Sequence, residues 1–278
     1  MSSSLSQPHA SQSGLSPSRA PQLLTPDISK ANFTDIRLVA TDMDGTLTVN
    51  GNFTPALLES FIALHAKGIE VLIVTGRSAG WVSGLVNYFP IVGAIAENGG
   101  LYIPKGTTSK DKPEPIILPD IPRITHHRDR LEALFNRLKK RYPHLSPSVD
   151  NPYRVTDWTF DIDGLTEADI AWMQTTCASQ TMGFTYSTVQ CHLKIIRQDK
   201  ASGLAKVLSQ TFPHLTPEQV ITVGDSPNDE SLFDASQFPH SVGVANVADY
   251  LPSLQHTPTY LTHAAEGNGF AELVAQLI

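Results

Sequence analysis

The sequence predicts an α/β protein: a Rossmann-like doubly wound parallel sheet core with an inserted α+β cap domain. Apolar segments rich in β-branched residues alternate with amphipathic helical segments between residues 38 and 96, as in strand–helix–strand units. This alternation stops after residue 100 and resumes near residue 199. The expected strands end in polar residues and glycine, where open parallel sheets bind their ligands.

The composition describes an ordinary globular chain. It has 278 residues, 41% hydrophobic and 17% charged, with a formal net charge of −7. The acidic balance argues against a nucleic-acid partner. No stretch approaches the roughly 18 apolar residues that span a bilayer, so no membrane partner is expected. We expect a cytoplasmic monomer or homodimer, with Cys177 and Cys191 reduced rather than joined in the one possible disulfide.

The N-terminal segment, residues 1–31, is rich in Ser, Pro and Gln and poor in aromatic residues. Such a composition buries too little surface to fold, so we expect a disordered tail. A Ser-rich leader is also compatible with an organelle transit peptide, although Arg19 is its one arginine and no amphipathic period is visible. We expect no secretory signal here, because the segment has no apolar h-region.

The first core strand carries the first candidate site. The stretch 38–48 reads LVATDMDGTLT, an apolar run that ends in Asp42 and Asp44. Side chains alternate along extended backbone, so both carboxylates can face one pocket. They would repel each other unless a cation or a shared proton intervenes, and the arrangement favours a hard metal such as Mg²⁺. The alternative is an Asp-Gly turn that only closes the strand.

The next core elements follow in order. Thr54 and Pro55 begin a helix that Gly68 ends, with an expected buried stripe of Leu57, Leu58, Phe61, Ile62 and Leu64. A strand over 69–74 leads to Thr75, Gly76 and Arg77, a helix spans 78–88, and a strand over 91–96 leads to Glu97 and Asn98.

The inserted segment, residues 101–194, is predicted to be the cap domain. We expect irregular chain over 101–122, then a basic helix over 125–141, a strand over 153–162, a helix from Thr166, and extended segments over 184–189 and 192–196. Residues 160–166, FDIDGLT, mimic the first motif, but the segment before them alternates in polarity. We interpret them as a cap strand that ends in an Asp-Gly turn.

The core, residues 32–100 and 195–278, resumes with a helix over 200–210. A strand over 220–223 then ends in GDSPND, where Ser226 and Pro227 should start a helical turn that contains Asn228 and Asp229. The remaining expected elements are a strand over 241–244, a helix over 247–254, a strand over 259–262 and a helix from 268.

Four motifs together resemble the haloacid dehalogenase-like superfamily of aspartyl phosphotransferases: D-x-D-G-T at 42–46, Thr75, Lys200 and G-D-x-x-N-D at 224–229. The cap, placed between the second and third motifs, is similar to that of the Cof-like and sucrose-phosphatase-like branch. The resemblance implies that Asp42 is a nucleophile, Asp44 an acid and base, Thr75 a phosphate ligand and Lys200 a charge-neutralising group. Ala201 departs from the glycine common in the family, and Lys194 is a rival for the lysine.

The same resemblance implies a Mg²⁺ site formed by Asp42, the backbone carbonyl of Asp44, and Asp225. Asn228 and Asp229 would support it. The supporting residues Gly76, Arg77 and Asn98 would contact substrate or form a hinge, although a surface salt bridge and a turn explain Arg77 and Asn98 equally well.

The function implied is a Mg²⁺-dependent phosphatase that acts on a small phosphorylated metabolite, with a sugar phosphate expected. Alternatives are a phosphomutase of the phosphomannomutase type and a non-catalytic sugar-phosphate sensor. Sugar hydroxyls and a second anionic group need polar and cationic partners. The cap candidates for that role are Arg154, Asp157, Trp158, His192 and Lys194.

Overall fold

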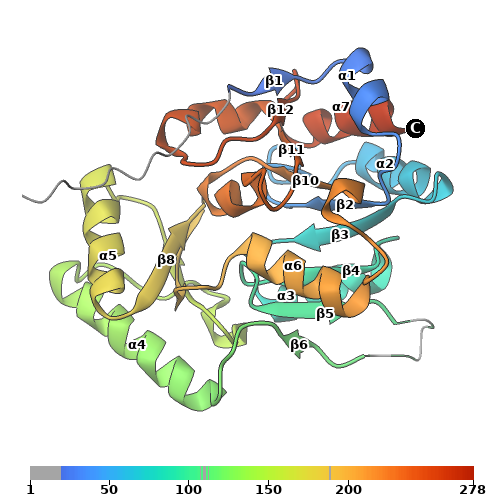
Figure 1. The fold of residues 1–278 in the computed structure, drawn as a ribbon. Coiled ribbons are helices and arrows are strands. Elements are labelled where there is room, and N and C mark those ends of the chain that lie inside the picture. The colour runs from blue at the N-terminus through green and yellow to red at the C-terminus, as the bar shows by residue number, and fades with distance from the viewer. Residues whose placement is uncertain (1–19, 107, 109–110, 112, 188) are drawn as a thin grey trace, which may run out of the picture.

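The computed structural model describes residues 20–106, 108, 111, 113–187 and 189–278, and it confirms the predicted α/β class (Figure 1). Nine strands form one sheet in the order β1-β12-β11-β10-β2-β3-β4-β5-β6. The strands from β1 through β4 in that order pair in parallel, and β5 and β6 add an antiparallel edge. Their bounds are β1 Gln22–Leu23, β2 Leu38–Thr41, β3 Glu70–Val74, β4 Gly93–Ala96, β5 Leu101–Pro104, β6 Ile116–Ile117, β10 Val220–Gly224, β11 His240–Gly243 and β12 Tyr260–Leu261.

Helices cover both faces of this sheet because its central strands are apolar on both sides. Val39 of β2 belongs to one buried cluster and its neighbours Leu38 and Ala40 to another, as the alternation of side chains requires. The first cluster takes side chains from α2 (Pro55–Ala66), α3 (Ala79–Tyr88) and α7 (Glu266–Leu277), and the second from α6 (Lys200–Thr211). The sheet is therefore doubly wound.

The chain leaves the central strand β2 toward β3 on one side and returns as β10 on the other. Thr41, the last residue of β2, lies in register with Ile73 of β3 and with Val223 of β10. The residues that follow these strands consequently meet at one edge of the sheet. This edge is the switch point at which open parallel sheets bind ligands.

A second sheet of three antiparallel strands lies beside this edge, in the order β7-β9-β8. Its strands are β7 Trp158–Asp161, β8 Met182–Tyr186 and β9 Gln190–Ile195. Helices α4 (Ile124–Arg141) and α5 (Glu167–Ser179) pack on it around a separate buried cluster. In β9, Cys191 and Leu193 point into that cluster, so His192 and Lys194 point to the opposite face.

Two features of the smaller unit follow the sequence closely. Thr166 caps α5 through a complete capping box with Asp169. The mimic of the first motif is a strand end: Asp161 closes β7, and Gly164 has a φ of +79° in the turn after it. Cys177 and Cys191 are buried free thiols, as expected.

The part of the tail that the structure describes is ordered, against expectation. β1 pairs with β12, and α1 (Pro26–Asn32) begins at the N-cap Thr25. Leu24 and Phe33 join the core cluster, which accounts for the order. The prediction for residues 1–19 lies outside the described residues.

Residues 101–104 and 116–117 were expected to be irregular, but they form β5 and β6 and extend the core sheet. The short apolar runs there suffice because β4 offers an open edge. The segment before β7 is a 3-10 turn, Asn151–Tyr153, followed by irregular chain, rather than strand. Because β5 and β6 pair with the core sheet, the inserted unit begins after β6.

Two further expectations about helices were wrong. Leu58 and Ile62 of α2 are 45% and 55% exposed, because the buried face of α2 is narrower than its apolar stripe. The helix expected over 247–254 is instead two 3-10 turns, Ala245–Asp249 and Leu251–Ser253, since Pro252 removes a donor. Two other 3-10 turns are Pro217–Gln219 and Pro227–Phe233. No helix in the described part of the chain is long and apolar enough to cross a membrane.

Candidate active site

Three buried carboxylates meet at the switch point. Asp42 follows β2, and its backbone N–H donates to the carbonyl of Val223 on β10. Asp225 follows β10, and Asp229 lies in the first turn beyond it. One oxygen from each of the three side chains lies within 4.8 Å of the others. Such a cluster requires cations nearby.

Lys200 supplies one of these cations. It is the first residue of α6, and Asp199 caps the helix by accepting from the Ser202 backbone at 2.8 Å. Its Nζ lies 2.5 Å from Oδ1 of Asp42 and 2.6 Å from Oδ1 of Asp229. Burial opposes the charge, but the two carboxylates raise the pKa of Lys200 above its ordinary value. The rival Lys194 instead donates to the backbone carbonyl of Gln198.

The remaining negative charge is not balanced by protein groups. Burial raises the pKa of Asp42 to about 7, against the lowering effect of Lys200. Burial and the charge of Asp42 raise the pKa of Asp225 to about 9. A divalent cation would relieve both, and oxygen ligands suit Mg²⁺. The donor set therefore fits the metal.

The contacts divide the carboxylates into ligands and supports. Both oxygens of Asp229 are engaged: one with Lys200 and the other with the backbone N–H groups of Asp225 and Ser226, at 3.0 and 3.1 Å. Lys200 contacts Asp42 through Oδ1, and each oxygen of Asp225 accepts a single hydrogen bond, from Thr46 or Asn246, so both carboxylates retain lone pairs for a metal. Gly45 is required between them, because a Cβ there would lie 2.5 Å from Oδ2 of Asp225.

Arg77 contacts Asp44 through two bonds. Its Nε donates to Oδ2 at 2.8 Å and its Nη2 to Oδ1 at 2.7 Å. The hydrogen bond with Asp44 raises the pKa of Arg77, and burial opposes it. Thr75, buried at the end of β3, accepts from the Arg77 backbone N–H at 3.1 Å. The sequence left open a surface salt bridge for Arg77. The structure shows a salt bridge, but with Asp44 of the candidate site.

Asn228 and Asn98 join the two sides of the site. Asn228 Nδ2 donates to Oδ1 of Asn98 at 3.1 Å, and Asn228 Oδ1 accepts from Ser226 at 2.7 Å. The amide nitrogen of Asn98 is buried without a partner among the described groups. Gly76 lies beside it, where an added Cβ would stand 3.2 Å from both Asn98 and His192.

These residues line a cavity of about 30 Å³ between the sheet edge and the smaller unit. The core contributes Asp42, Asp44, Thr75, Gly76, Arg77, Ser226 and Asn228. The β8–β9 hairpin of the inserted unit contributes Ser187, Val189, Gln190 and His192. The cavity is small because the inserted unit lies directly over the carboxylates.

Of the five cap candidates, His192 is the one that lines this cavity. Its Nδ1 lies 2.8 Å from Oδ2 of Asp157, which Arg154 also contacts at 3.0 Å. Arg154 further donates to the carbonyl of Gly76 at 2.9 Å, so this buried pair joins the smaller unit to the core. Trp158 packs against Phe135, within the hydrophobic cluster of the smaller unit. Asp157, Arg154, Trp158 and Lys194 thus lie behind the site rather than on its wall.

Sequence reasoning missed two groups of site residues. Asn246 donates to Oδ2 of Asp225 at 2.9 Å and to the carbonyl of Gly45 at 3.1 Å, and Thr46 donates to Oδ1 of Asp225 at 3.2 Å. The threonine lies inside the first motif, so its position gave a signal. Asn246 and the hairpin residues Ser187, Val189 and Gln190 have none, because only the fold brings them to the site.

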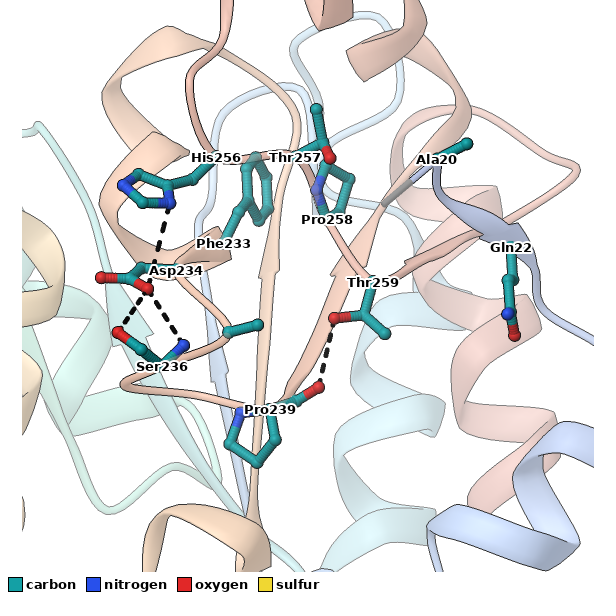
Figure 2. Close-up of a pocket in the computed structure, with 11 residues that line it drawn as sticks. Ala20, Gln22, Phe233, Asp234, Ser236, Pro239, His256, Thr257, Pro258 and Thr259 are labelled. Carbon is teal, nitrogen blue, oxygen red and sulfur yellow. Dashed lines mark hydrogen bonds and ion pairs between the residues drawn. The ribbon is translucent and has the colours of Figure 1, made fainter. Parts of the chain in front are cut away.

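A larger cavity, of about 320 Å³, lies elsewhere, beside β11 and β12 (Figure 2). Its polar groups satisfy one another: Ser236 donates to Asp234 at 2.7 Å, and Thr259 donates to the carbonyl of Pro239 at 3.1 Å. Its described lining includes none of the residues of the four motifs. Size therefore does not identify the site in this protein.

The switch-point carboxylates, the buried lysine and the overlying second sheet define a class of protein: a capped Rossmann-like hydrolase. Residues 39–113 match the family model of the haloacid dehalogenase-like hydrolases. This match confirms the resemblance predicted from the four motifs, and relatives named as phosphatases support a phosphoric monoester hydrolase.

Relatives with assigned names are similar over most of their length. The chain is 28% identical to phosphoglycolate phosphatase 1 of Saccharolobus solfataricus, covering 87% of this chain and 96% of the relative. It is 26% identical to a phosphoglycolate phosphatase of Methanothrix thermoacetophila, covering 86% and 96%. A crystal structure from Thermoplasma acidophilum superposes with a TM-score of 0.69 at 21% identity, covering 87% of this chain and 98% of that one.

Proposed function

We propose that the protein is a Mg²⁺-dependent phosphatase that hydrolyses a phosphomonoester of a small metabolite through an aspartyl phosphate on Asp42. One observation carries the proposal: Asp42 is held by Lys200 and lies beside Asp225, in a cavity whose wall also contains Asp44. A buried carboxylate next to cations, open toward an acid, is the arrangement that nucleophilic phosphoryl transfer needs.

The metal would be held by Asp42, Asp225 and the backbone carbonyl of Asp44, with Asn246 and Thr46 fixing Asp225. When bound, Mg²⁺ would neutralise negative charge that develops on the phosphoryl oxygens. Asp229 and Asn228 are proposed as supports. Asp229 orients Lys200, and Asn228 ties the metal side to Asn98.

Two steps then follow. An oxygen of Asp42 attacks phosphorus, the bond from phosphorus to the leaving oxygen breaks, and Asp44 gives its proton to that oxygen. Water next attacks phosphorus, its proton returns to Asp44, and the bond from phosphorus to Asp42 breaks to release phosphate. The Thr75 hydroxyl and Lys200 stabilise the transferred group throughout.

The substrate is proposed to be small, because the β8–β9 hairpin of the inserted unit forms part of the cavity wall opposite Asp42 and Asp44. A sugar phosphate was the expectation from the sequence. The names of the relatives point instead to a phosphorylated two-carbon acid such as phosphoglycolate. We further propose that the protein works in the cytoplasm, as a monomer or homodimer, without a nucleic-acid or membrane partner. Its acidic balance and reduced thiols support this.

The test is phosphate release from a panel of phosphoglycolate, sugar phosphates and nucleotides, with Mg²⁺ and with chelator, beside Asp42→Asn. We expect the wild type to release phosphate in a Mg²⁺-dependent reaction, and we expect no such release from Asp42→Asn. Full activity of Asp42→Asn would contradict the mechanism. Stimulation by a sugar bisphosphate would favour a phosphomutase, and ligand-induced stabilisation without release would favour a sensor.

A further inference from the structure

We propose that Arg77 is the receptor for a carboxylate on the leaving group of the substrate, and that this carboxylate takes the place on the guanidinium that Asp44 holds. The inference rests on the proposed phosphatase function and names its substrate class. That class is the small phosphate ester with a carboxylate close to the ester oxygen.

The Arg77 guanidinium is already arranged for a carboxylate. It makes two parallel bonds, of 2.8 and 2.7 Å, to the oxygens of Asp44, which is the fork geometry that arginine forms with carboxylates. Its backbone N–H is tied to Thr75, and its Cζ lies 5.2 Å from the centre of the Trp81 ring. A substrate carboxylate would therefore meet a preorganised partner.

Other cations near the cavity are committed. Lys200 is shared between Asp42 and Asp229, and Arg154 is fully buried between Asp150 and Asp157. Among the described residues that line the cavity, Arg77 alone carries a guanidinium or ammonium group. A second anionic group on the substrate consequently has Arg77 as its partner.

His192 is the remaining basic group on the described wall. Its Nδ1 faces Asp157, which fixes the ring. Burial lowers the pKa of His192 and outweighs the opposing effect of Asp157, which favours the neutral imidazole. A neutral ring can bond a hydroxyl or an ester oxygen, but it does not balance an anion.

The exchange frees Asp44. The side chains of Arg77 and Asp44 are 34% and 31% exposed, so both reach solvent and can turn. In the pair, both oxygens of Asp44 face the guanidinium. The proposed acid must instead face the ester oxygen of the substrate. A substrate carboxylate on Arg77 releases Asp44 to do so, whereas an uncharged leaving group does not compete for the guanidinium.

The test compares two esters that differ at one position. 2-Phosphoglycolate carries a carboxylate where 2-hydroxyethyl phosphate carries a hydroxymethyl group. We expect the wild type to prefer phosphoglycolate by about 100-fold or more in kcat/KM. Arg77→Gln should lower kcat/KM for phosphoglycolate by about 100-fold but should not lower it for the other ester, because Asp44 is then free of the guanidinium with either substrate. Arg77→Lys keeps the charge but loses the fork, so an intermediate loss is expected.

Arg37→Gln is the matched control, because Arg37 also pairs with an aspartate but lies exposed at the surface, and it should leave both reactions unchanged. Thermal unfolding of each variant checks the fold. Equal losses on both esters, or a wild type without preference, would overturn the inference and leave the phosphatase standing. A wild type inert toward both esters and the whole panel would overturn the proposed function together with the inference.

Discussion

The core side of the site and the side contributed by the inserted unit use charge differently. On the core side, each charged group faces the cavity or a neighbour in it: Lys200 contacts Asp42 and Asp229, and Arg77 contacts Asp44. On the other side, Arg154 and Asp157 are buried against each other and bond to the cavity-lining residues Gln190 and His192. The proposed reaction requires the first arrangement, while packing determines the second. Substitutions on the two sides should therefore separate residues that take part in the chemistry from residues that support them.

The largest effect should come from Asp42→Asn, which removes the proposed nucleophile. We expect kcat to fall by about 10⁴-fold or more, with the fold retained. Asp161→Asn is the matched control, because Asp161 begins the mimic D-x-D-G yet ends a strand of the inserted unit. Steady-state phosphate release measures both. A similar loss of kcat in the two variants would show that the core aspartate and the cap aspartate do not differ in catalytic importance.

Lys200→Ala comes next. It leaves Asp42 and Asp229 without their shared cation, so we expect kcat to fall by about 10²- to 10³-fold. The free energy of unfolding should also fall by about 3–5 kcal/mol, since a buried ion pair loses one partner. Urea denaturation and phosphate release measure these two changes. Lys67→Ala, at the end of α2, is the control; an unchanged stability of Lys200→Ala would refute the buried pair.

Asn246→Ala tests a support that the motifs did not reveal. It removes bonds to Asp225 and to the Gly45 carbonyl. Loss of such an outer contact typically weakens metal binding by about 10- to 100-fold. We expect a higher Mg²⁺ requirement, with kcat largely recovered at saturating metal, in an activity titration. Asn136→Ala on α4 should change nothing, and a kcat that excess Mg²⁺ does not restore would argue against this role.

The smallest effect is a pH dependence of stability. The pKa of Asp42 is raised from 3.8 to about 7, chiefly by burial. Between these values the folded metal-free chain holds a proton that the unfolded chain releases, so its free energy of unfolding falls as the pH rises from about 4 to about 7. Mg²⁺ replaces that proton, and its stabilising effect should therefore grow over the same interval. Thermal unfolding with and without Mg²⁺ measures this; an effect independent of pH would count against the cluster.

The sequence was sufficient for the parts of the molecule in which a local pattern determines the outcome. The apolar strands β2, β3 and β10, the capping box at Thr166 and the turn at Ser226 follow from residue type and spacing. The four motifs also come together as expected, because parallel strands bring their carboxyl ends to one edge.

Other parts depended on tertiary contacts. β5 and β6 form because β4 offers an edge, and α1 is ordered because Leu24 and Phe33 reach the core. The wall of the cavity is set by the β8–β9 hairpin, whose sequence carries no motif. Arg154 and Trp158 looked available for substrate but are buried, since spacing does not report burial.

The most direct test of the central claim is to trap the phosphoryl group. Asp44→Asn removes the proposed base for the second step, while a substrate with a good leaving group, such as acetyl phosphate, needs no acid in the first. The variant should be mixed with acetyl phosphate and Mg²⁺, quenched in acid and analysed by peptide mass spectrometry. The proposed mechanism predicts a phosphoryl group on the peptide that contains Asp42. It predicts none in the double variant that combines Asp42→Asn with Asp44→Asn. A phosphoryl group on another residue, or turnover by Asp44→Asn at the wild-type rate, would contradict it.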